Sequence, residues 1–596
     1  MKNIKKDLFI LVFLLPIVFL IASVALTGWP QGLIPNINYP YLINDDGAFS
    51  LIQKIIEGSI YENNRIGFPL GSSTKDYPQP DGLNLFLIKL LSIFTPNWVA
   101  VHNLFYLLTF PAVFLTSYIV LRVYKINHYY SILGSISFTF LPFHFVRLHH
   151  LFLANYAVVP LFWLIALKIF RSNYPKELNF LKISFYGLCL SFMGALGIYY
   201  AIFGMILIIT TGIFTGLNKT SYEPIKHSIF FIIPIIIGLL VHLLIPLLGT
   251  INENMTVVNT LPKRSIIESE LYAFSLPQLL SPTHSHNIEF LSKIASFISS
   301  NTLNANENTT SSLGIIGSLG FLLSLLYIFL KLSGRKIEPK FIFISTLLLI
   351  LFLFGLSGGF GSIFAFTITS SLRAWNRVSI FIGFGSILLF FMFLNYQSSN
   401  LIKKFKTNKL LSKVFNIFLV ILTSIIIIDL IPRPCINCSS PISNKFQEKL
   451  RFFNEIENHL SPNASVYQMP FMQYPEVPPK NNIKDYELFD GFLLTKNIKW
   501  SYGTIKNTQA DILMMEISQL PLEKKIQFLK KIGFDGIYYN ANGYVNDDIY
   551  NNLEGLLGKP IFVNKSLGLF FFDLGKNNDL IFSKNNLRQL LNEHKK

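Results

Sequence analysis

Charged residues are scarce in this chain of 596 residues: Asp, Glu, Lys and Arg make up 14% of it, whereas 51% is hydrophobic. Soluble domains carry roughly 25% charged residues, so the composition argues against an ordinary soluble protein. The formal net charge of +17 does not require nucleic-acid binding, because basic residues accumulate in the cytoplasmic loops of membrane proteins. Zinc-type Cys/His spacing, a Walker loop and RNA-binding signatures are also lacking, so we expect no nucleic-acid partner.

Cysteine is nearly absent as well, with three residues in the chain. Cys189 lies within an apolar run, where we expect it to serve as inert packing. Cys435 and Cys438 form a CxxC pair just after the last apolar segment. The pair is compatible with a disulfide outside the cytoplasm and equally with two thiols in a linker. No thioredoxin-like βαβ pattern surrounds it, which disfavours redox catalysis.

Long hydrophobic runs are abundant. A membrane-spanning helix needs roughly 20 apolar residues, and a helix satisfies its own backbone hydrogen bonds in lipid. The first run exceeds the roughly 7–15 residues of a signal-peptide core, which predicts an uncleaved first helix. The expected fold class is a polytopic α-helical membrane protein with about eleven spans, near 8–26, 99–121, 128–146, 151–167, 183–197, 201–217, 228–248, 313–330, 341–357, 378–395 and 415–432.

The distribution of basic residues predicts the orientation. With Met1 inside, the inside connections hold 20 Lys or Arg and the longer outside stretches hold 10, as the positive-inside rule requires. The count assumes a break near Gly197 that divides 183–217 into two short helices, since one long helix there would reverse everything downstream. We therefore expect a multi-pass protein of the bacterial inner (cytoplasmic) membrane, with a cytoplasmic N-terminus and a periplasmic or extracellular C-terminal domain.

The pattern changes near residue 440. Residues 1–435 form the expected transmembrane domain, with long outside loops at 27–98 and 249–312. The first loop contains short apolar helices near 47–58 and 83–95, and the end of the second, 299–312, is typical of a flexible segment. Residues 440–596 are expected to form a soluble extracytoplasmic α/β domain, with helices at 443–459, 522–532 and 546–556 and strands at 465–469, 536–539, 561–563 and 568–573.

Acidic residues of the first outside loop are the first candidates for catalysis. Asp45 and Asp46 lie in NDDG, before a short apolar helix. Such a pair suits a general base for an acceptor hydroxyl, or ligands for a divalent cation such as Mg²⁺ or Mn²⁺. The alternative is a pair of solvated loop acids at an Asp-Gly turn. Asp76 and Asp81, in KDYPQPDG, are candidate substrate ligands, although turn and cap roles explain each of them alone.

Basic residues at the outside ends of the spans contravene the positive-inside tendency. The segment 141–150 brings together Arg147, His149 and His150. A phosphate is the natural partner because guanidinium groups bind its oxygens in a bidentate way; the alternative is snorkelling to lipid headgroups. Two more outside segments add candidate phosphate ligands (Lys263, Arg264, Arg373, Arg377) and substrate ligands (Glu268, Glu270, Trp375). Together these side chains are suited to surround a lipid-linked phosphate or pyrophosphate, although each alone is more often a membrane-edge anchor.

The C-terminal domain offers aromatic candidates. Trp500 and Tyr502 follow one another closely in KWSYG, and their rings are suitable platforms for the faces of sugars. The alternative is packing, because small α/β domains have aromatic cores. The sequence contains no GxSxG motif, and we expect no serine triad.

The combination of these features resembles a known superfamily. A first helix, a long outside loop with an early acidic pair, amphipathic helices in that loop, many further spans and an extracytoplasmic C-terminal domain are similar to the GT-C glycosyltransferases. The stretches PFHFVRLHHLFLANY (142–156), RAWNRVSIF (373–381) and KWSYG (499–503) also resemble bacterial membrane proteins classed as glycosyltransferases. The resemblance covers most of the chain, and its acidic motif is short. The WWDYG-like motif of oligosaccharyltransferases is lacking, which argues against transfer to protein asparagine.

The resemblance implies an enzyme that moves a sugar from a polyprenyl-phosphate or polyprenyl-diphosphate donor to a cell-surface glycan, lipid or protein acceptor. It implies that Asp45 or Asp46 deprotonates the acceptor, while preorganised cations stabilise the leaving phosphate. Inversion at the sugar is implied by analogy alone. Apart from a divalent cation, no cofactor is expected.

Two alternatives from other classes stay open. A transporter or flippase of lipid-linked saccharide usually places ionisable groups near the middle of the membrane. The spans here are almost free of charge at their centres, with Asp429 near the edge of the last one. The other alternative is a non-catalytic protein of envelope-glycan assembly, whose outer domain binds a glycan or a partner.

Overall fold

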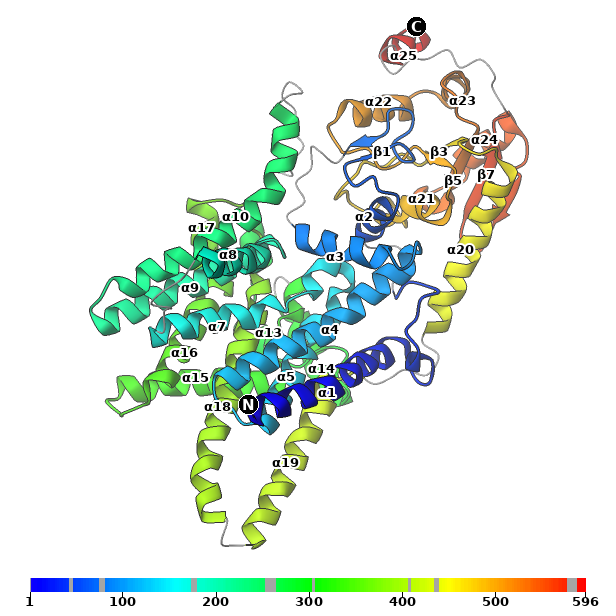
Figure 1. The fold of residues 1–596 in the computed structure, drawn as a ribbon. Helices are drawn as coiled ribbons and strands as arrows, with labels where there is room; N and C mark the ends of the chain where they lie inside the picture. The colour runs from blue at the N-terminus through cyan, green and yellow to red at the C-terminus, as the bar shows by residue number, and fades with distance from the viewer. Residues whose placement is uncertain are drawn as a thin grey trace.

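The computed structural model describes residues 2–41, 47–73, 81–172, 180–251, 264–302, 306–405, 409–432, 439–575 and 587–595. It shows a large helical body and, beside it, an α/β region that carries the C-terminus (Figure 1). The expected fold class, a helical membrane protein with an α/β region at its C-terminal end, is confirmed.

Each expected span coincides with at least part of a helix. Seven segments of the described chain are long and apolar enough to cross a membrane, by length and composition. The chain is thus a multi-pass membrane protein, while the total of eleven spans stays a prediction. The helices are α1 (Lys2–Thr27), α4 (Trp98–Val123), α5 (His128–Thr139), α7 (Val158–Arg171), α8 (Phe180–Gly194), α9 (Ile198–Lys219), α10 (Glu223–Ile251), α15 (Gly314–Leu332), α16 (Pro339–Gly355), α18 (Ser379–Phe405) and α19 (Lys409–Leu430).

The helix of the third expected span, 128–146, is interrupted. It ends at Thr139, and Leu141 has ψ 143°. Proline has no N–H to donate and disfavours helical backbone at the preceding residue, so Pro142 explains the break. The chain continues in two short elements, α6 (Pro142–Phe145) and the 3-10 helix η2 (Val146–Ala154). This interruption places Arg147 on η2 instead of on a continuous span.

α8 and α9 are separate helices, as the division of 183–217 requires. Gly197 lies between them with φ +148°. α10 packs against both, and glycines allow it to approach α8 closely. A Cβ on Gly194 would lie 2.0 Å from the carbonyl oxygen of Ile235, and one on Gly238 would lie 1.9 Å from that of Ser191. Small residues serve this purpose at the interfaces of membrane helices.

The first long loop contains its two short helices at the expected positions. α2 (Gly47–Ile56) packs Phe49 against Trp98 of α4, with ring centroids 4.9 Å apart. α3 (Gly82–Ser92) packs against α2 and α4. The 3-10 helix η1 (Gln31–Leu33) precedes α2, and the strands β1 (Glu62–Asn63) and β2 (Ser72–Ser73) lie between α2 and α3.

The second long loop is more structured than the sequence suggests. Its described elements are α12 (Glu268–Leu271), α13 (Leu276–Leu280), α14 (Glu289–Ser300) and η3 (Glu307–Thr310). Two further short elements, α17 (Phe360–Thr367) and η4 (Trp375–Val378), follow α16. The prediction of a flexible segment at 299–312 is wrong from Asn306 onward. Asn308 is buried, and its side-chain amide donates to the carbonyl oxygen of Ala273 at 2.9 Å. Residues 303–305 lie outside the described residues.

The C-terminal region is built on one five-stranded sheet in the order β4-β3-β5-β7-β6. β3 pairs in parallel with β4 and β5, whereas β7 pairs antiparallel with β5 and β6. The strands are β3 (Ser465–Met469), β4 (Lys499–Trp500), β5 (Gly536–Asn540), β6 (Phe562–Asn564) and β7 (Leu569–Asp573). The helices are α20 (Ser439–His459), η5 (Glu487–Phe489), α21 (Asp490–Leu494), α22 (Gln509–Ser518), α23 (Leu522–Lys531), η6 (Ala541–Gly543), α24 (Asp548–Leu557) and α25 (Leu587–Lys595). The sequence predicted four of these strands; β4 is too short to show an alternating pattern.

The first long loop extends this sheet at its β4 edge. The N–H of Trp500 donates to the oxygen of Arg65 at 2.7 Å, and the N–H groups of Gly67 and Phe68 donate to Tyr502 and Trp500 at 3.0 Å. Figure 1 shows the loop, in blue, inside the orange α/β region. The boundary expected between 435 and 440 stays a prediction, but the α/β region is packed together with part of the first outside loop.

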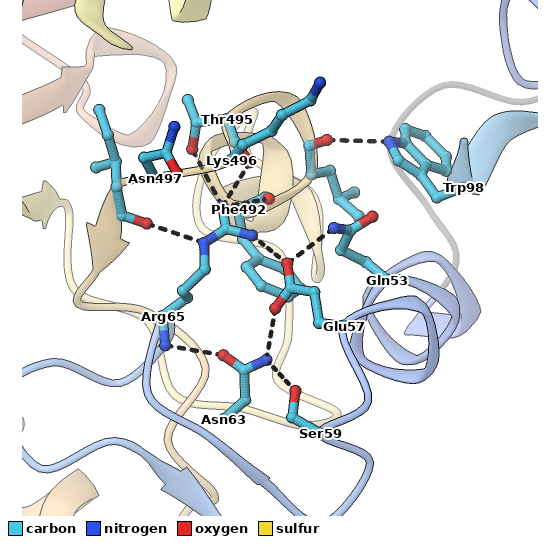
Figure 2. A network of polar contacts seen from close by, with 12 residues as sticks. Gln53, Glu57, Ser59, Asn63, Arg65, Trp98, Phe492, Thr495, Lys496 and Asn497 are labelled. Carbon is cyan, nitrogen blue, oxygen red and sulfur yellow. Dashed lines mark hydrogen bonds and ion pairs between the residues drawn. The ribbon is translucent and has the colours of Figure 1, made fainter. Parts of the chain in front are cut away.

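Arg65 is the centre of this junction (Figure 2). Its guanidinium donates to the carbonyl oxygens of Phe492 at 3.1 Å and Ile498 at 3.3 Å, and it forms an ion pair with Glu57 of the same loop. Nearby, the indole N–H of Trp98 donates to the oxygen of Leu493 at 3.0 Å. The contacts join the start of α4 and the first outside loop to the segment around α21.

Candidate active site

Three charged side chains meet where η2, η3 and η4 come together. Arg147 Nη1 lies 2.6 Å from Glu307 Oε1. Arg377 approaches the same carboxylate from η4, with Nε 2.9 Å from Oε1 and Nη2 3.1 Å from Oε2. We call Arg147, Glu307 and Arg377 the inner cluster. It contains two guanidinium groups and one carboxylate, so it has one excess positive charge.

Both arginines of the inner cluster are held by aromatic rings. The guanidinium carbon of Arg147 lies 4.1 Å from the ring centroid of Phe143, and that of Arg377 lies 4.4 Å from the ring of Tyr199. Arg147 is 1% exposed, and its Nε and Nη2 have no hydrogen-bond partner within the described part of the chain. A buried guanidinium with free N–H groups is costly unless a ligand completes it, and an oxyanion is the chemical partner that it fits.

Glu307 has the electrostatics of a carboxylate that stays ionised. Burial alone would raise its pKa, but the charges of Arg377 and Arg147 hold the pKa of Glu307 well below its ordinary value. His150, at a kink within η2 (φ −139°, ψ 66°), also interacts with the charge of Glu307. His149 and His150 both lie toward the exposed side of η2.

Asp81 lies at the start of α3, at the end of the first loop. Its Oδ1 is 3.0 Å from the position that a Cβ on Gly197 would take, so glycine makes room for it. Burial raises the pKa of Asp81 to about 7, while the charge of Arg377 acts in the opposite direction. Asn84 of α3 fixes the local backbone through hydrogen bonds with Leu196 and Asn155, both at 2.9 Å.

Asn376 is a further polar residue at this place. It is 1% exposed, and neither its side-chain oxygen nor its nitrogen has a partner among the described residues. Its neighbour Trp375 is fully buried, with ring centroids 5.8 Å from both Phe203 and Phe354. Trp375 thus packs among aromatic rings, but its indole Nε1, like the side-chain amide of Asn376, has no partner among the described residues. The expectation that Trp375 contacts a substrate stays a prediction, and Asn376, which was not among the predicted residues, also has free hydrogen-bonding capacity.

Two other predicted cations, Arg264 and Arg373, lie in a second group. We call this group the rim cluster: Arg264, Glu268, Arg373 and Glu476. Arg264 Nη2 contacts both oxygens of Glu476 in the α/β region, at 2.8 and 2.6 Å. Arg373 Nη1 lies 2.8 Å from Glu268. Each guanidinium of the rim cluster thus has its own carboxylate partner. The expected role of Arg264 and Arg373 in binding a phosphate stays a prediction.

Glu268 and Glu270, predicted as substrate ligands, have structural partners. Glu268 pairs with Arg373, and Glu270 accepts hydrogen bonds from Gly358 N at 2.7 Å and Ser357 Oγ at 2.8 Å. Glu270 thus ties α12 to the turn after α16. Neither carboxylate is part of the inner cluster.

Trp500 and Tyr502 lie in the core of the α/β region and are 1% and 5% exposed. The indole of Trp500 donates to Thr495 Oγ1 at 3.0 Å, and the hydroxyl of Tyr502 donates to Asp485 O at 2.9 Å. A sugar has no access to these ring faces. The packing role, the alternative at the sequence level, accounts for both.

Some predicted residues lie outside the described residues: Asp45, Asp46, Asp76, Lys263, Cys435 and Cys438. Their predicted roles are unchanged. Within the described ranges, no group of three or more His, Cys, Asp or Glu side chains is arranged to hold a metal ion. The cation expected at Asp45 and Asp46 therefore stays a prediction.

Solved structures share this architecture. No protein-family model and no curated protein sequence matches the chain. ArnT from Cupriavidus metallidurans, solved with undecaprenyl phosphate bound, aligns with a TM-score of 0.50 over 97% of this chain and 99% of its own, at 10% identity. Arabinofuranosyltransferase AftD from Mycobacteria aligns with a TM-score of 0.50 at 11% identity, over 95% of this chain and 41% of its own. The chain shares the fold of these two structures. It spans less than half of AftD.

Sequence reasoning found both arginines of the inner cluster but missed Glu307 and Asn376. Glu307 lies in the polar, Asn-rich end of the second loop, where nothing in the local sequence marks an acidic residue as functional. The only available signal was the anomaly of two arginines at the outside ends of spans, which requires a compensating charge. Glu307 lies 160 residues from Arg147 in the chain, so no local pattern reveals the pairing.

Proposed function

We propose that this protein is a membrane glycosyltransferase that takes a sugar from a polyprenyl-phosphate or polyprenyl-diphosphate donor and attaches it to an acceptor at the outer face of the inner membrane. The observation that carries the proposal is the inner cluster: a buried arginine pair with one carboxylate and with free N–H groups on Arg147. The fold adds support, because ArnT, of the same fold, was solved with undecaprenyl phosphate.

The chemistry assigns a task to each charge. An acceptor hydroxyl oxygen forms a bond with C1 of the sugar while the bond from C1 to the donor phosphate oxygen breaks. That oxygen keeps the electron pair, and the excess positive charge of Arg147 and Arg377 stabilises it as its negative charge develops. Asn376, with its unpartnered amide, is placed to orient a phosphate or sugar oxygen.

A carboxylate of the first loop takes the acceptor proton. Asp81 is the described candidate, and its pKa of about 7 suits a general base, which works best when its pKa is near the ambient pH. Asp45 and Asp46 remain proposed for the same role, or for a divalent cation. All three belong to the loop in which GT-C enzymes are expected to have their acid.

The test compares surface glycans by mass spectrometry in cells that lack the gene and express variants. We expect Arg147→Gln to leave the glycan unmodified. Arg122→Gln is the matched control, because Arg122 also pairs with a carboxylate, Asp7 at 3.0 Å. It lies in the last turn of α4 and is not part of the inner cluster. Normal glycans in the Arg147 variant, at equal amounts of protein in the membrane, contradict the proposal. Saccharide translocation without a new glycosidic bond favours a flippase instead.

A further inference from the structure

The helix α14 of the second outside loop exposes two large aromatic side chains. Phe290 and Phe297 are 68% and 69% exposed. They are seven residues apart, so they lie on the same face of the helix, two turns from each other. A single exposed apolar side chain needs no explanation, whereas a contiguous apolar surface marks a place of interaction.

The sequence of α14 divides its circumference into three sectors, at about 100° per residue. One sector contains the buried Ala295 and is turned to the protein, one is apolar and exposed, and one is polar and exposed. The sectors are Leu291, Ala295 and Ile298 for the first, Phe290, Ile294 and Phe297 for the second, and Glu289, Lys293, Ser296 and Ser300 for the third. A surface helix between protein and water needs only two sectors. A third, apolar one fits a helix that also touches lipid.

The start of α14 lies at the end of two helices of the membrane body. The side-chain amide of Asn287, just before α14, donates to the carbonyl oxygens of Ile428 and Ile431 at the end of α19, both at 2.6 Å. At the same place, the N–H of Ile315 donates to Asp429 Oδ2 at 2.7 Å. That N–H belongs to the first turn of α15, one of the helices long and apolar enough to cross a membrane. α14 therefore starts at the boundary of the apolar layer.

The exposed apolar surface continues from α14 onto the neighbouring membrane helices. Ile288, the residue before α14, is exposed and lines one hollow together with Ile427 and Ile428 of α19. Both of these isoleucines are exposed, as on helix faces in contact with lipid. Trp29, which follows α1, lines the same hollow and is also exposed, and tryptophan is enriched at membrane–water interfaces. This continuity favours lipid over a protein partner as the occupant of the α14 surface.

The charges of α14 cancel. The helix has one acidic and one basic residue, and Lys293 Nζ lies 2.8 Å from Glu289 Oε1, with both side chains exposed. Helices that bind a membrane through its anionic lipids have many Lys and Arg residues on the polar face. α14 lacks such an excess, so its attraction to a bilayer comes from apolar area.

We propose that α14 lies in the plane of the membrane interface, with Phe290 and Phe297 inserted between lipid molecules, and that this contact does not depend on anionic lipid. The proposal is independent of the proposed enzymatic function. It gives the second outside loop a fixed depth: Glu307 follows Ser300, the last residue of α14, by seven residues. The anchored helix thus holds the carboxylate of the inner cluster near the membrane surface.

The experiment measures the surroundings of single nitroxide labels on the full chain in nanodiscs, with the three native cysteines replaced by serine. Labels are attached at Phe290→Cys and Phe297→Cys and, as matched controls on the polar sector, at Lys293→Cys and Ser300→Cys. Power-saturation EPR compares the collisions of each label with oxygen, which concentrates in lipid, and with a nickel chelate, which stays in water. We expect the oxygen-to-nickel ratio to be about threefold higher or more at the two phenylalanine positions.

The lipid composition tests the role of charge. The ratios should be the same within about twofold in nanodiscs of phosphatidylcholine and of phosphatidylcholine mixed with phosphatidylglycerol. A larger increase with phosphatidylglycerol overturns the independence from anionic lipid. Ratios at Phe290→Cys and Phe297→Cys that equal those of the polar sector overturn the insertion. Little collision with either reagent at these positions shows that protein covers them, and this overturns lipid as the occupant.

A second set of variants tests whether the two rings hold the helix in place, with the label at Ile294→Cys. Phe290→Glu combined with Phe297→Glu should lower the oxygen-to-nickel ratio at this position about threefold. Ser296→Glu combined with Ser300→Glu is the control, because it adds the same two charges to the polar sector and should leave the ratio unchanged. An unchanged ratio in the first variant, or an equal fall in both, overturns the role of the rings.

Discussion

The inner and rim clusters are built from the same residue types and differ in completeness. In the rim cluster, two arginines face two carboxylates, and Arg264 uses both oxygens of Glu476. In the inner cluster, two arginines share one carboxylate, and Arg147 is buried with two unpartnered nitrogens. A complete set of ion pairs holds parts of the protein together. An incomplete, buried set is suited to binding an anion, because an anionic ligand can accept hydrogen bonds from the guanidinium groups that have no partner within the protein.

The largest expected effect is on activity. Arg377→Gln should lower the rate of sugar transfer by roughly 100- to 1,000-fold, the usual cost of removing one preorganised donor at a developing charge. The equivalent change in the rim cluster, Arg373→Gln, should lower it by less than about tenfold. Initial rates with a polyprenyl-phosphate sugar donor at saturating acceptor measure both. Similar losses of transfer rate in the two variants would contradict the functional distinction between the clusters.

The next effect is on stability. Glu307→Gln leaves two buried guanidinium groups without their carboxylate, and breaking a buried ion pair costs about 3–5 kcal/mol. We expect Tm to fall by several degrees in a thermal unfolding assay, and undecaprenyl phosphate to raise the Tm of this variant more than that of the wild type. Glu476→Gln is the control in the rim cluster, and undecaprenyl phosphate should raise its Tm by the same amount as that of the wild type. An unchanged Tm in Glu307→Gln would contradict the view that Glu307 stabilises the protein by pairing with the two buried arginines.

A third effect depends on pH. The pKa of Asp81 is raised to about 7, so in the folded state the carboxyl is protonated over a range in which the unfolded chain has already lost its proton. Its contribution to stability is complete below pH 4, declines between about pH 4 and 7, and is lost above. Asp81→Asn should therefore raise Tm relative to the wild type at pH 8, with the difference shrinking toward pH 5.

The activity of the wild type gives an independent reading of Asp81. If this carboxylate is the base, kcat/KM rises with pH through about 7, and Asp81→Asn removes both the step and most of the activity. An unchanged pH profile in Asp81→Asn transfers the role to Asp45 or Asp46.

The smallest effect concerns the pair that joins the two regions. A double-mutant cycle on Arg264 and Glu476 should give a coupling energy of about 1 kcal/mol or less, and salt should reduce it, because both side chains are partly exposed. Thermal unfolding of the single and double glutamine variants measures it. A coupling of several kcal/mol would mean that the rim cluster is as constrained as the inner one.

Much of the fold follows from the sequence, because hydrophobic runs and periodicity are local. The expected spans, the division near Gly197 and the strands β3, β5, β6 and β7 were all visible. Two features were not. The interruption of the third span depends on Pro142, which lies inside an apolar run that is otherwise long enough. The extension of the sheet by Arg65–Phe68 joins segments more than 400 residues apart, and such pairing leaves no local pattern.

The residues of the candidate site also fall into those that could be predicted from the sequence and those that could not. Arg147 and Arg377 were predicted because arginine at the outside end of a span is anomalous. The sequence could not separate them from Arg264 and Arg373, since all four have the same local context and differ only in their distant partners. Trp500 and Tyr502 were ambiguous for the same reason: burial, not residue type, decides between a sugar platform and a core.

The most direct measurement is the affinity of the protein for undecaprenyl phosphate, by microscale thermophoresis in detergent or nanodiscs. Lysine keeps the charge of arginine but loses its two-pronged geometry, so Arg147→Lys isolates the feature that matters. The account predicts that Kd rises at least tenfold in Arg147→Lys and stays within about twofold in Arg264→Lys. Equal affinities in the wild type and the Arg147 variant would contradict the assignment of the inner cluster as the phosphate site.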